Sequence, residues 1–282
     1  MNKFSACLNL IRFRNPIGFW LLLWPGLWGL FIESGFGIKE FAIVVLGSFL
    51  TRSLGCAIND ILDRDFDSKV ERTKTRPIAS GELSLLEALL FTAAIGFACV
   101  FLLLQTNQFT MLLVAYCAIP LIIFYPLAKR FVAIPQLVLG ITFGLSLPIS
   151  YSIVHGYISL GAIYLYLACI FWIVAYDSYY ALSDVNDDKK ININSLPLVF
   201  GSSTLKVINI FYALFVVMIG LFAIHNNYGI LKFGVLFLIY QGYYQNKLGT
   251  DGHYIEAFKS NSHVGLVIAM IFFIENQNEF FS

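Results

Sequence analysis

Long apolar stretches recur along the whole chain, and they constrain its fold more than any other feature. A transmembrane helix needs about 20 mostly apolar residues. Nine stretches are interpreted as spans: residues 16–32, 41–61, 85–104, 110–127, 135–154, 160–182, 205–224, 229–245 and 263–274. Only 12% of the 282 residues are charged, about half the 25% typical of soluble domains. Because backbone polar groups in lipid must bond within the protein, we expect an all-α, polytopic membrane protein with nine transmembrane helices.

Lysine and arginine are unevenly distributed between the two sides of this predicted bundle. Most of the 18 Lys and Arg residues lie in the N-terminal tail and in the loops after the second, fourth, sixth and eighth spans. Cytoplasmic loops carry such an excess, so the N-terminus and these loops are predicted to be cytoplasmic. Residues 1–11 are too short for a transit peptide, which favours a bacterial inner membrane. Residues 62–84 and 183–204 are predicted to be cytoplasmic cap loops of a single transmembrane domain, residues 1–282.

The composition argues against several classes of function. The formal net charge is +1, and no basic run carries interleaved aromatic residues, so no nucleic-acid partner is expected. The five cysteines form no CxxC pair and the four histidines show no ligand spacing. These patterns favour packed thiols over a disulfide framework or a zinc site. The partner that the composition does indicate is the lipid bilayer.

Two clusters of carboxylates stand at the cytoplasmic ends of the second and sixth spans. They hold eight of the 17 acidic residues: Asp60, Asp63, Asp65 and Asp67 beside Asn59, and Asp177, Asp184, Asp187 and Asp188. Carboxylates four residues apart share a helix face and repel each other. A divalent cation removes the repulsion, and Mg2+ in proteins combines carboxylates with phosphate oxygens of a substrate. The clusters therefore predict a Mg2+–diphosphate site, with ordinary solvated turn aspartates as the alternative.

Basic and aromatic residues near the clusters each allow two interpretations. Arg72 and Arg76 follow the first cluster and can hold phosphate oxygens. Arg52 lies inside the second span, where an arginine costs about 2.5–3.5 kcal/mol. It is expected either to bind an anionic group of a substrate or to pair with a buried carboxylate. The first span carries a tryptophan at every fourth position, namely Trp20, Trp24 and Trp28. We interpret this stripe as packing, with the wall of a groove for an apolar chain as the alternative.

Taken together, these motifs resemble those of intramembrane aromatic prenyltransferases. Asn59-Asp60-x-x-Asp63-x-x-x-Asp67 with Glu71-Arg72-Thr73-x-x-Arg76-Pro77 resembles their first aspartate-rich motif, and Asp177-x-x-Tyr180-Ala181-x-x-Asp184-x-x-Asp187-Asp188 resembles the second. Arg12-x-x-x-Pro16-Ile17-Gly18 and Tyr125-Pro126-x-x-Lys129-Arg130 are similar to the 4-hydroxybenzoate polyprenyltransferase branch. One departure is that Asn194-Ser195-Leu196 stands where the branch has lysine, serine and threonine.

The resemblance implies a fold, a reaction and a set of site residues. Nine helices would surround a central cavity under a cytoplasmic cap. A polyprenyl group would pass from polyprenyl diphosphate to the ring of 4-hydroxybenzoate, ortho to the hydroxyl, in ubiquinone biosynthesis. The catalytic residues would be Asp63, Asp67, Asp184 and Asp188, and the Mg2+ ligands would also include Asn59, Asp60 and Asp187. Substrate would be bound by Arg52, Asn59, Arg72, Arg76, Lys129, Arg130, Asp177 and Tyr180.

Two alternatives to this function stay open at the level of sequence. The first is prenyl transfer to another acceptor, such as haem, a naphthoate or homogentisate. The second is a cation-coupled membrane transporter, because intramembrane carboxylates and an arginine also mark ion pathways. The acidic residues gather at helix ends rather than at mid-bilayer, which favours the enzyme.

Overall fold

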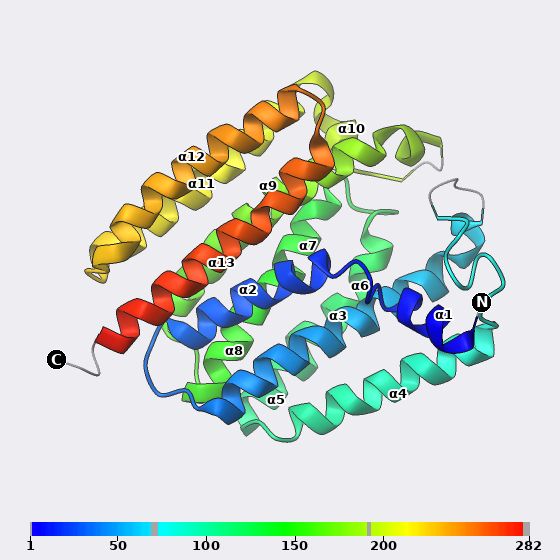
Figure 1. Ribbon diagram of the computed structural model, residues 1–282, viewed down its shortest axis with the longest axis horizontal. Coiled ribbons are helices and arrows are strands. Elements are labelled where there is room, and N and C mark those ends of the chain that lie inside the picture. The colour runs from blue at the N-terminus through cyan, green and yellow to red at the C-terminus, as the bar shows by residue number, and fades with distance from the viewer. Residues whose placement is uncertain (1, 69–72, 191–192, 279–282) are drawn as a thin grey trace.

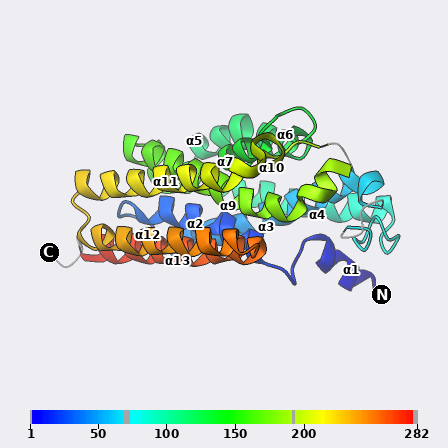
Figure 2. The same cartoon turned by 90° about the horizontal axis from the view of Figure 1, so that it is seen from above.

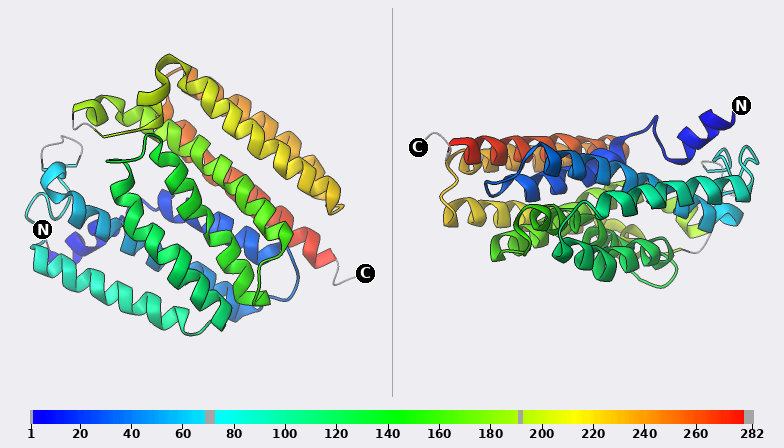
Figure 3. Two further views of the ribbon diagram at one scale, coloured as in Figure 1. Left: turned by 180° about the vertical axis from the view of Figure 1, so that it is seen from behind. Right: turned by 90° about the horizontal axis from the view of Figure 1, so that it is seen from below.

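The protein is helical throughout the part of the chain that the computed structural model describes, residues 2–68, 73–190 and 193–278. Its elements are α1 (Lys3–Leu10), α2 (Ile17–Phe31), α3 (Ile38–Asp67), α4 (Leu85–Leu103), α5 (Gln108–Leu113), the π-helix η1 (Val114–Ala118), α6 (Ile119–Ala128), α7 (Pro135–Gly144), α8 (Ser146–His155), α9 (Leu160–Lys190), α10 (Leu196–Phe200), the 3-10 helix η2 (Gly201–Ser203), α11 (Thr204–His225), α12 (Gly229–Thr250) and α13 (Tyr254–Asn278). The long helices form an elongated bundle (Figures 1 and 2). Helices α2 and α13 lie on one face (Figure 1), and the green helices α6 to α9 lie on the other (Figure 3).

All nine predicted spans are helical, and the multi-span membrane fold is confirmed. Within the described residues, seven segments are long and apolar enough to cross a membrane: Ile38–Asp67, Leu85–Leu103, Gln108–Ala128, Pro135–His155, Leu160–Lys190, Leu196–His225 and Tyr254–Asn276. Helix α2 is apolar but has only 15 residues. Helix α12 is polar in its second half, which contains Gln241, Gln245 and Asn246. The number of nine spans therefore stays a prediction.

Helices α3 and α9 continue further than the predicted spans. They end at Asp67 and Lys190, so the first part of each predicted cap loop is helical. The carboxylates of both clusters consequently stand on the last turns of two long helices rather than in loops. A short helix, α1, also forms in the N-terminal tail, where Asn2 caps it by accepting a hydrogen bond from the Phe4 N–H at 3.2 Å.

Two predicted spans are interrupted by proline. Pro120 has no N–H to donate to the carbonyl one turn before it, and the π-helix η1 ends just ahead of this residue. Pro148 likewise leaves the carbonyl of Gly144 without its helical donor, and α7 ends there. The spans predicted over residues 110–127 and 135–154 are thus each divided into shorter helices.

The hydrophobic core joins α2 to α9, α11 and α13. Trp28 is fully buried and stacks on Trp172 of α9, with ring centroids 5.0 Å apart. Its Nε1 donates a hydrogen bond to the carbonyl of Gly265 in α13 at 2.9 Å. Trp24 is 7% exposed in the same core, whereas Trp20 is 39% exposed. The packing interpretation of the tryptophan stripe is therefore confirmed for Trp24 and Trp28.

Gly29 allows α2 to approach α8 closely. A Cβ at this position would overlap the carbonyl of Leu147, a backbone group that cannot rotate away. We expect Gly29→Ala to lower the free energy of unfolding by about 1–3 kcal/mol, measured as a lower melting temperature in detergent. Gly96→Ala is the matched control, because a Cβ at Gly96 meets no described atom within 4 Å. Equal melting temperatures for the two variants would contradict this account of the helix contact.

Candidate active site

A large cavity opens inside the bundle, at the end where α3 and α9 finish. Its volume is about 1050 Å3. The site residues predicted from sequence that line it are Arg52, Asn59, Asp60, Asp63, Asp67, Arg76, Lys129, Arg130, Asp177, Tyr180, Asp184, Asp187 and Asp188. Arg72 lies outside the described residues. The C-terminal ends of α3 and α9 lie on the same side of the bundle as α1 (Figure 1). The ends of α3 and α9, more than 100 residues apart in sequence, therefore line the same cavity.

The carboxylates in the last turns of α3 lie on different faces of the helix, one turned inward and one exposed. Asp60, Asp63 and Asp67 are buried, with 1%, 3% and 7% of their surface exposed, and all three line the cavity. The side chain of Asp65 is 81% exposed and contacts Arg64 at 3.4 Å. This division follows from the helical period, because residues four apart share a face. The face that sequence spacing assigned to chemistry is the one turned inward.

Basic side chains from other segments neutralise Asp63 and Asp67. Lys129 Nζ lies 2.5 Å from Asp63 Oδ2, and Arg130 Nη2 lies 3.0 Å from Asp63 Oδ1. Arg76 Nη1, from the segment after α3, lies 2.7 Å from Asp67 Oδ2. Charges taken out of water need such partners. Three of the cations that sequence reasoning assigned to substrate, Arg76, Lys129 and Arg130, therefore contact carboxylates of α3.

Asp60 is held by two arginines. Its Oδ1 accepts from Arg12 Nη2 at 2.7 Å and also contacts Arg76 Nη1 at 3.1 Å. Burial works to lower the pKa of Arg76, but the charges of Asp60 and Asp67 outweigh it and hold that pKa above its ordinary value. Arg76 therefore stays charged at the cavity wall. Asp60 Oδ2 is buried and has no hydrogen-bond partner among the described residues.

Arg12 is a cavity residue that sequence reasoning matched to a motif but gave no role. It follows α1 with a φ of 58°, and the chain turns in a Schellman arrangement: the Phe13 N–H bonds the Leu8 carbonyl and the Arg12 N–H bonds the Asn9 carbonyl, both at 3.0 Å. Glycine is usual at this position, and a left-handed conformation costs other residues roughly 1–2 kcal/mol. Sequence reasoning gave Arg12 no site role because a basic residue in the N-terminal tail was counted only as evidence for the orientation of the protein in the membrane.

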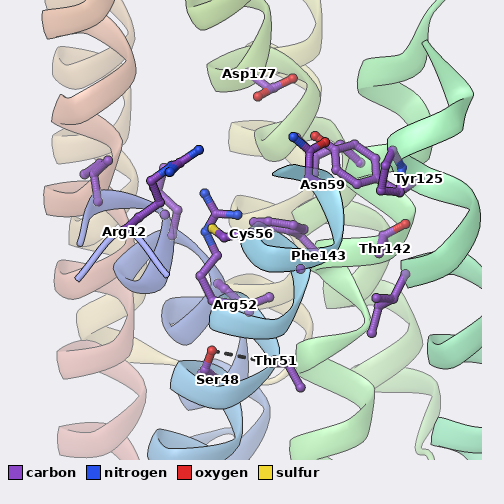
Figure 4. A pocket seen from close by; sticks show the side chains of 18 of the residues that line it. Arg12, Ser48, Thr51, Arg52, Cys56, Asn59, Tyr125, Thr142, Phe143 and Asp177 are labelled. Atoms are coloured by element: carbon purple, nitrogen blue, oxygen red, sulfur yellow. Dashed lines mark hydrogen bonds between the residues drawn. The ribbon is translucent and has the colours of Figure 1, made fainter. Parts of the chain in front are cut away.

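Arg52 faces the cavity from the middle of α3. Its guanidinium lies 5.9 Å from the centroid of the Phe143 ring and so close to Gly18 that a Cβ there would overlap it. Asp177 faces it from α9 (Figure 4) and lies within range of its charge. Among the described residues, however, Arg52 forms no ion pair. In the part of the chain that the structure describes, the ion pair with a buried carboxylate, which was the alternative for this arginine, is therefore not found.

The second cluster lies along the last turns of α9. Asp177, Asp184 and Asp188 line the cavity and are partly buried. Asp187 lines it as well, and its Oδ1 accepts from Lys190 Nζ at 3.0 Å. These carboxylates belong to a different helix from Asn59, which enters the cavity from α3 beneath Asp177 in Figure 4. The two clusters therefore place carboxylate and amide oxygens from two helices on the wall of one cavity.

These residues fit a magnesium ion that is bound together with a diphosphate. No group of three Asp, Glu, His or Cys side chains in the described parts of the chain is arranged to hold a metal by itself. Mg2+ commonly takes one or two carboxylates, keeps several waters and completes its shell with substrate phosphate. The donors on the wall are carboxylate and amide oxygens, and no described residue forms a hydrogen bond with the buried Asp60 Oδ2. The donor chemistry matches this ion, with phosphate oxygens required to complete the site.

Comparison of the sequence with known proteins gives close agreement over most of its length. A model described as "UbiA prenyltransferase family" matches residues 22–261. The chain is 39% identical over 273 residues to a 4-hydroxybenzoate octaprenyltransferase of Nitrosomonas eutropha, covering 94% of this chain and 95% of that protein. It is 38% identical over 275 residues to a protein of the same name from Shewanella loihica, covering 95% of each.

Solved structures agree with the fold. A UbiA homolog from Aeropyrum pernix in its apo form superposes with a TM-score of 0.81 at 23% identity, covering 92% of this chain and 97% of the other. A UbiA homolog from Archaeoglobus fulgidus bound to GPP and Mg2+ superposes with a TM-score of 0.75 at 18% identity, covering 95% and 99%. At these identities the likeness supports the helical architecture alone.

Proposed function

The chain belongs to the UbiA prenyltransferase family, and from this we propose that it transfers a polyprenyl group from polyprenyl diphosphate to 4-hydroxybenzoate in ubiquinone biosynthesis. The observation that carries the proposal is the cavity whose wall combines both carboxylate clusters with basic residues. Relatives named 4-hydroxybenzoate octaprenyltransferase, alike over nearly the full chain, support the acceptor. Membership of a prenyltransferase family removes the transporter alternative.

The acidic end of the cavity would bind the diphosphate of the donor with Mg2+. Its ligands would come from Asn59, Asp60, Asp63, Asp67, Asp184, Asp187 and Asp188. The A. fulgidus UbiA homolog bound to GPP and Mg2+ supports a prenyl diphosphate and Mg2+ as ligands. When bound, the ion supplies positive charge against the leaving diphosphate. Arg72, Arg76, Lys129 and Arg130 would hold phosphate oxygens. We also propose that residues 1–282 act as one domain in the bacterial inner membrane, with this end cytoplasmic.

The reaction would proceed by departure of diphosphate from the allylic carbon. The carbon–oxygen bond breaks, and the basic side chains stabilise the negative charge that develops on the leaving oxygen. The ring carbon ortho to the phenol then forms the new carbon–carbon bond, and its proton passes to a cavity carboxylate or to diphosphate. Asp177 and Tyr180, on α9, would line this acceptor region. The enclosing helices exclude water that would otherwise capture the allylic cation.

Arg52 would bind the carboxylate of the acceptor. Because a hydrogen bond to a charged group contributes about 1.5–3 kcal/mol, we expect Arg52→Gln to raise the KM for 4-hydroxybenzoate by roughly 10- to 100-fold. Gly18→Ala should give a weaker effect in the same direction, since a Cβ there displaces the guanidinium. Steady-state kinetics with varied acceptor measure both. For the uncharged acceptor 4-hydroxybenzamide, wild type and Arg52→Gln should have similar KM values, and a large difference would argue against this pairing.

The function itself is tested with purified protein in lipid vesicles. The assay supplies Mg2+, octaprenyl diphosphate and 4-hydroxybenzoate, and mass spectrometry detects a ring-prenylated product. A naphthoate, homogentisate and haem replace the acceptor in parallel reactions. Preference for one of these would reassign the acceptor, and failure with every acceptor would refute the proposal.

A further inference from the structure

We propose that Arg12 binds the diphosphate of the prenyl donor, so that the N-terminal helix α1 contributes a side chain to the active site. The inference rests on the proposed function, because it assigns one more ligand to the same substrate. Arg12 lines the cavity and precedes both aspartate-rich motifs in the sequence. In Figure 4 its side chain and that of Arg52 extend into the space below Asp177.

The contacts of Arg12 leave it able to hold a phosphate oxygen. Its Nη1 donates to the Asn9 carbonyl at 3.1 Å and its Nη2 donates to Asp60 Oδ1 at 2.7 Å. A guanidinium carries five N–H donors in a planar fork that suits phosphate. Its Asp60 partner is next to Asn59 and one helical turn from Asp63, so the guanidinium stands at the proposed diphosphate end.

Neutralising Asp60 does not by itself account for Arg12. Arg76 Nη1 contacts the same carboxylate oxygen, Asp60 Oδ1, at 3.1 Å. Arg76 also pairs with Asp67, and Asp63 pairs with Lys129 and Arg130. Among the described residues, the three buried carboxylates of α3 are therefore in contact with four cations, an excess of one positive charge on this side of the cavity. Such an excess suits a site that receives an anion, because the ligand matches the additional positive charge.

The backbone at Arg12 supports a role for its side chain. The residue adopts a left-handed conformation at the turn that ends α1, where glycine would be free of strain. Strained residues of this kind persist where the surrounding structure holds them and often mark functional sites. A glycine at this position would ease the turn and lose the guanidinium.

Helix α1 is anchored firmly enough to present Arg12 from a fixed position. Ala6 and Leu10 are buried against a small cluster formed with α3 and α4. Lys3 adds an ion pair to Glu87 at 2.8 Å and a hydrogen bond to the Glu82 carbonyl at 3.1 Å. The N-terminal segment is therefore packed onto the bundle beside the cavity rather than left as a tail.

Arg12→Gly separates the role of the side chain from that of the backbone. We expect kcat/KM for octaprenyl diphosphate to fall at least tenfold and the KM for 4-hydroxybenzoate to stay within twofold, in a protein that still shows a cooperative melting transition. Arg12→Lys should recover part of the loss, and Arg12→Asn, which tolerates the left-handed turn, should behave like Arg12→Gly. Arg64→Ala is the control for loss of a positive charge, since Arg64 pairs with the exposed Asp65 outside the cavity.

A double variant distinguishes phosphate binding from charge balance. If Arg12 only neutralises Asp60, the double variant Arg12→Gly with Asp60→Asn should be as active as Asp60→Asn alone. If Arg12 binds diphosphate, the double variant should remain at least tenfold less active than Asp60→Asn. The increase in melting temperature on adding Mg2+ and inorganic diphosphate gives a readout independent of turnover. This increase should be smaller in Arg12→Gly than in the wild type. Wild-type kinetics and an unchanged increase in Arg12→Gly would overturn this inference, whereas an inactive wild-type protein would instead overturn the proposed function.

Discussion

Asp184→Asn is expected to lower kcat/KM for prenyl transfer by roughly 100- to 1000-fold, the range found when one group that stabilises developing charge is removed. Asp184 stands on the cavity wall, facing the cluster carried by α3. The asparagine keeps the shape of the side chain but removes its charge, so metal–diphosphate binding loses a carboxylate. Steady-state kinetics in vesicles, with a melting temperature recorded for each variant, measure the effect.

Asp65→Asn is the matched control for that variant. Asp65 lies within the first cluster in sequence, yet its side chain is 81% exposed and turned away from the cavity. Its substitution should change kcat/KM by less than threefold. Similar rates for the two variants, or a folded Asp184→Asn enzyme within a few-fold of wild type, would contradict the two-cluster site.

Removal of divalent metal is expected to abolish turnover. The carboxylate and amide oxygens of the cavity wall suit Mg2+, and without the ion the leaving diphosphate loses the positive charge that the ion would supply. Treatment with EDTA should reduce product formation to background, and added MgCl2 should restore it. Product formation is followed by mass spectrometry in the same vesicle assay.

A binding measurement serves as the control for metal removal. EDTA should leave the melting temperature nearly unchanged, because basic side chains neutralise Asp60, Asp63 and Asp67. Mg2+ and inorganic diphosphate together should raise it, since a ligand that binds only the folded state stabilises that state. Full activity in EDTA with the fold intact would remove the metal from the mechanism.

The sequence predicted the inward face of α3 because two strong signals coincide there. Carboxylates are rare in an apolar chain, and Asn59, Asp63 and Asp67 recur every four residues. Helical periodicity then assigns them to one side, and the structure lines the cavity with all three. Apolar runs likewise located every long helix, because in lipid the backbone has few alternatives to helix.

Other features depend on contacts that local sequence does not encode. The bond between Arg12 and Asp60 joins residues 48 positions apart, and that between Lys129 and Asp63 joins residues 66 apart. Helix α13 runs from Tyr254 to Asn278, beyond the predicted residues 263–274. Within this extension Asn261, polar in sequence, accepts a hydrogen bond from Trp172 Nε1 at 2.7 Å inside the core. Contacts with other helices decide such cases, so composition alone underestimates the length of the helix.

The pairing of Asp63 with Lys129 and Arg130 bears on how a cycle of turnover ends. If these two cations hold diphosphate, as proposed, the ligand would compete for them with Asp63, which lies 2.5 Å from Lys129 and 3.0 Å from Arg130. After prenyl transfer, Asp63 would compete with the product diphosphate for Lys129 and Arg130. On the proposed mechanism, this competition would weaken the binding of the product diphosphate and would favour its release after each transfer.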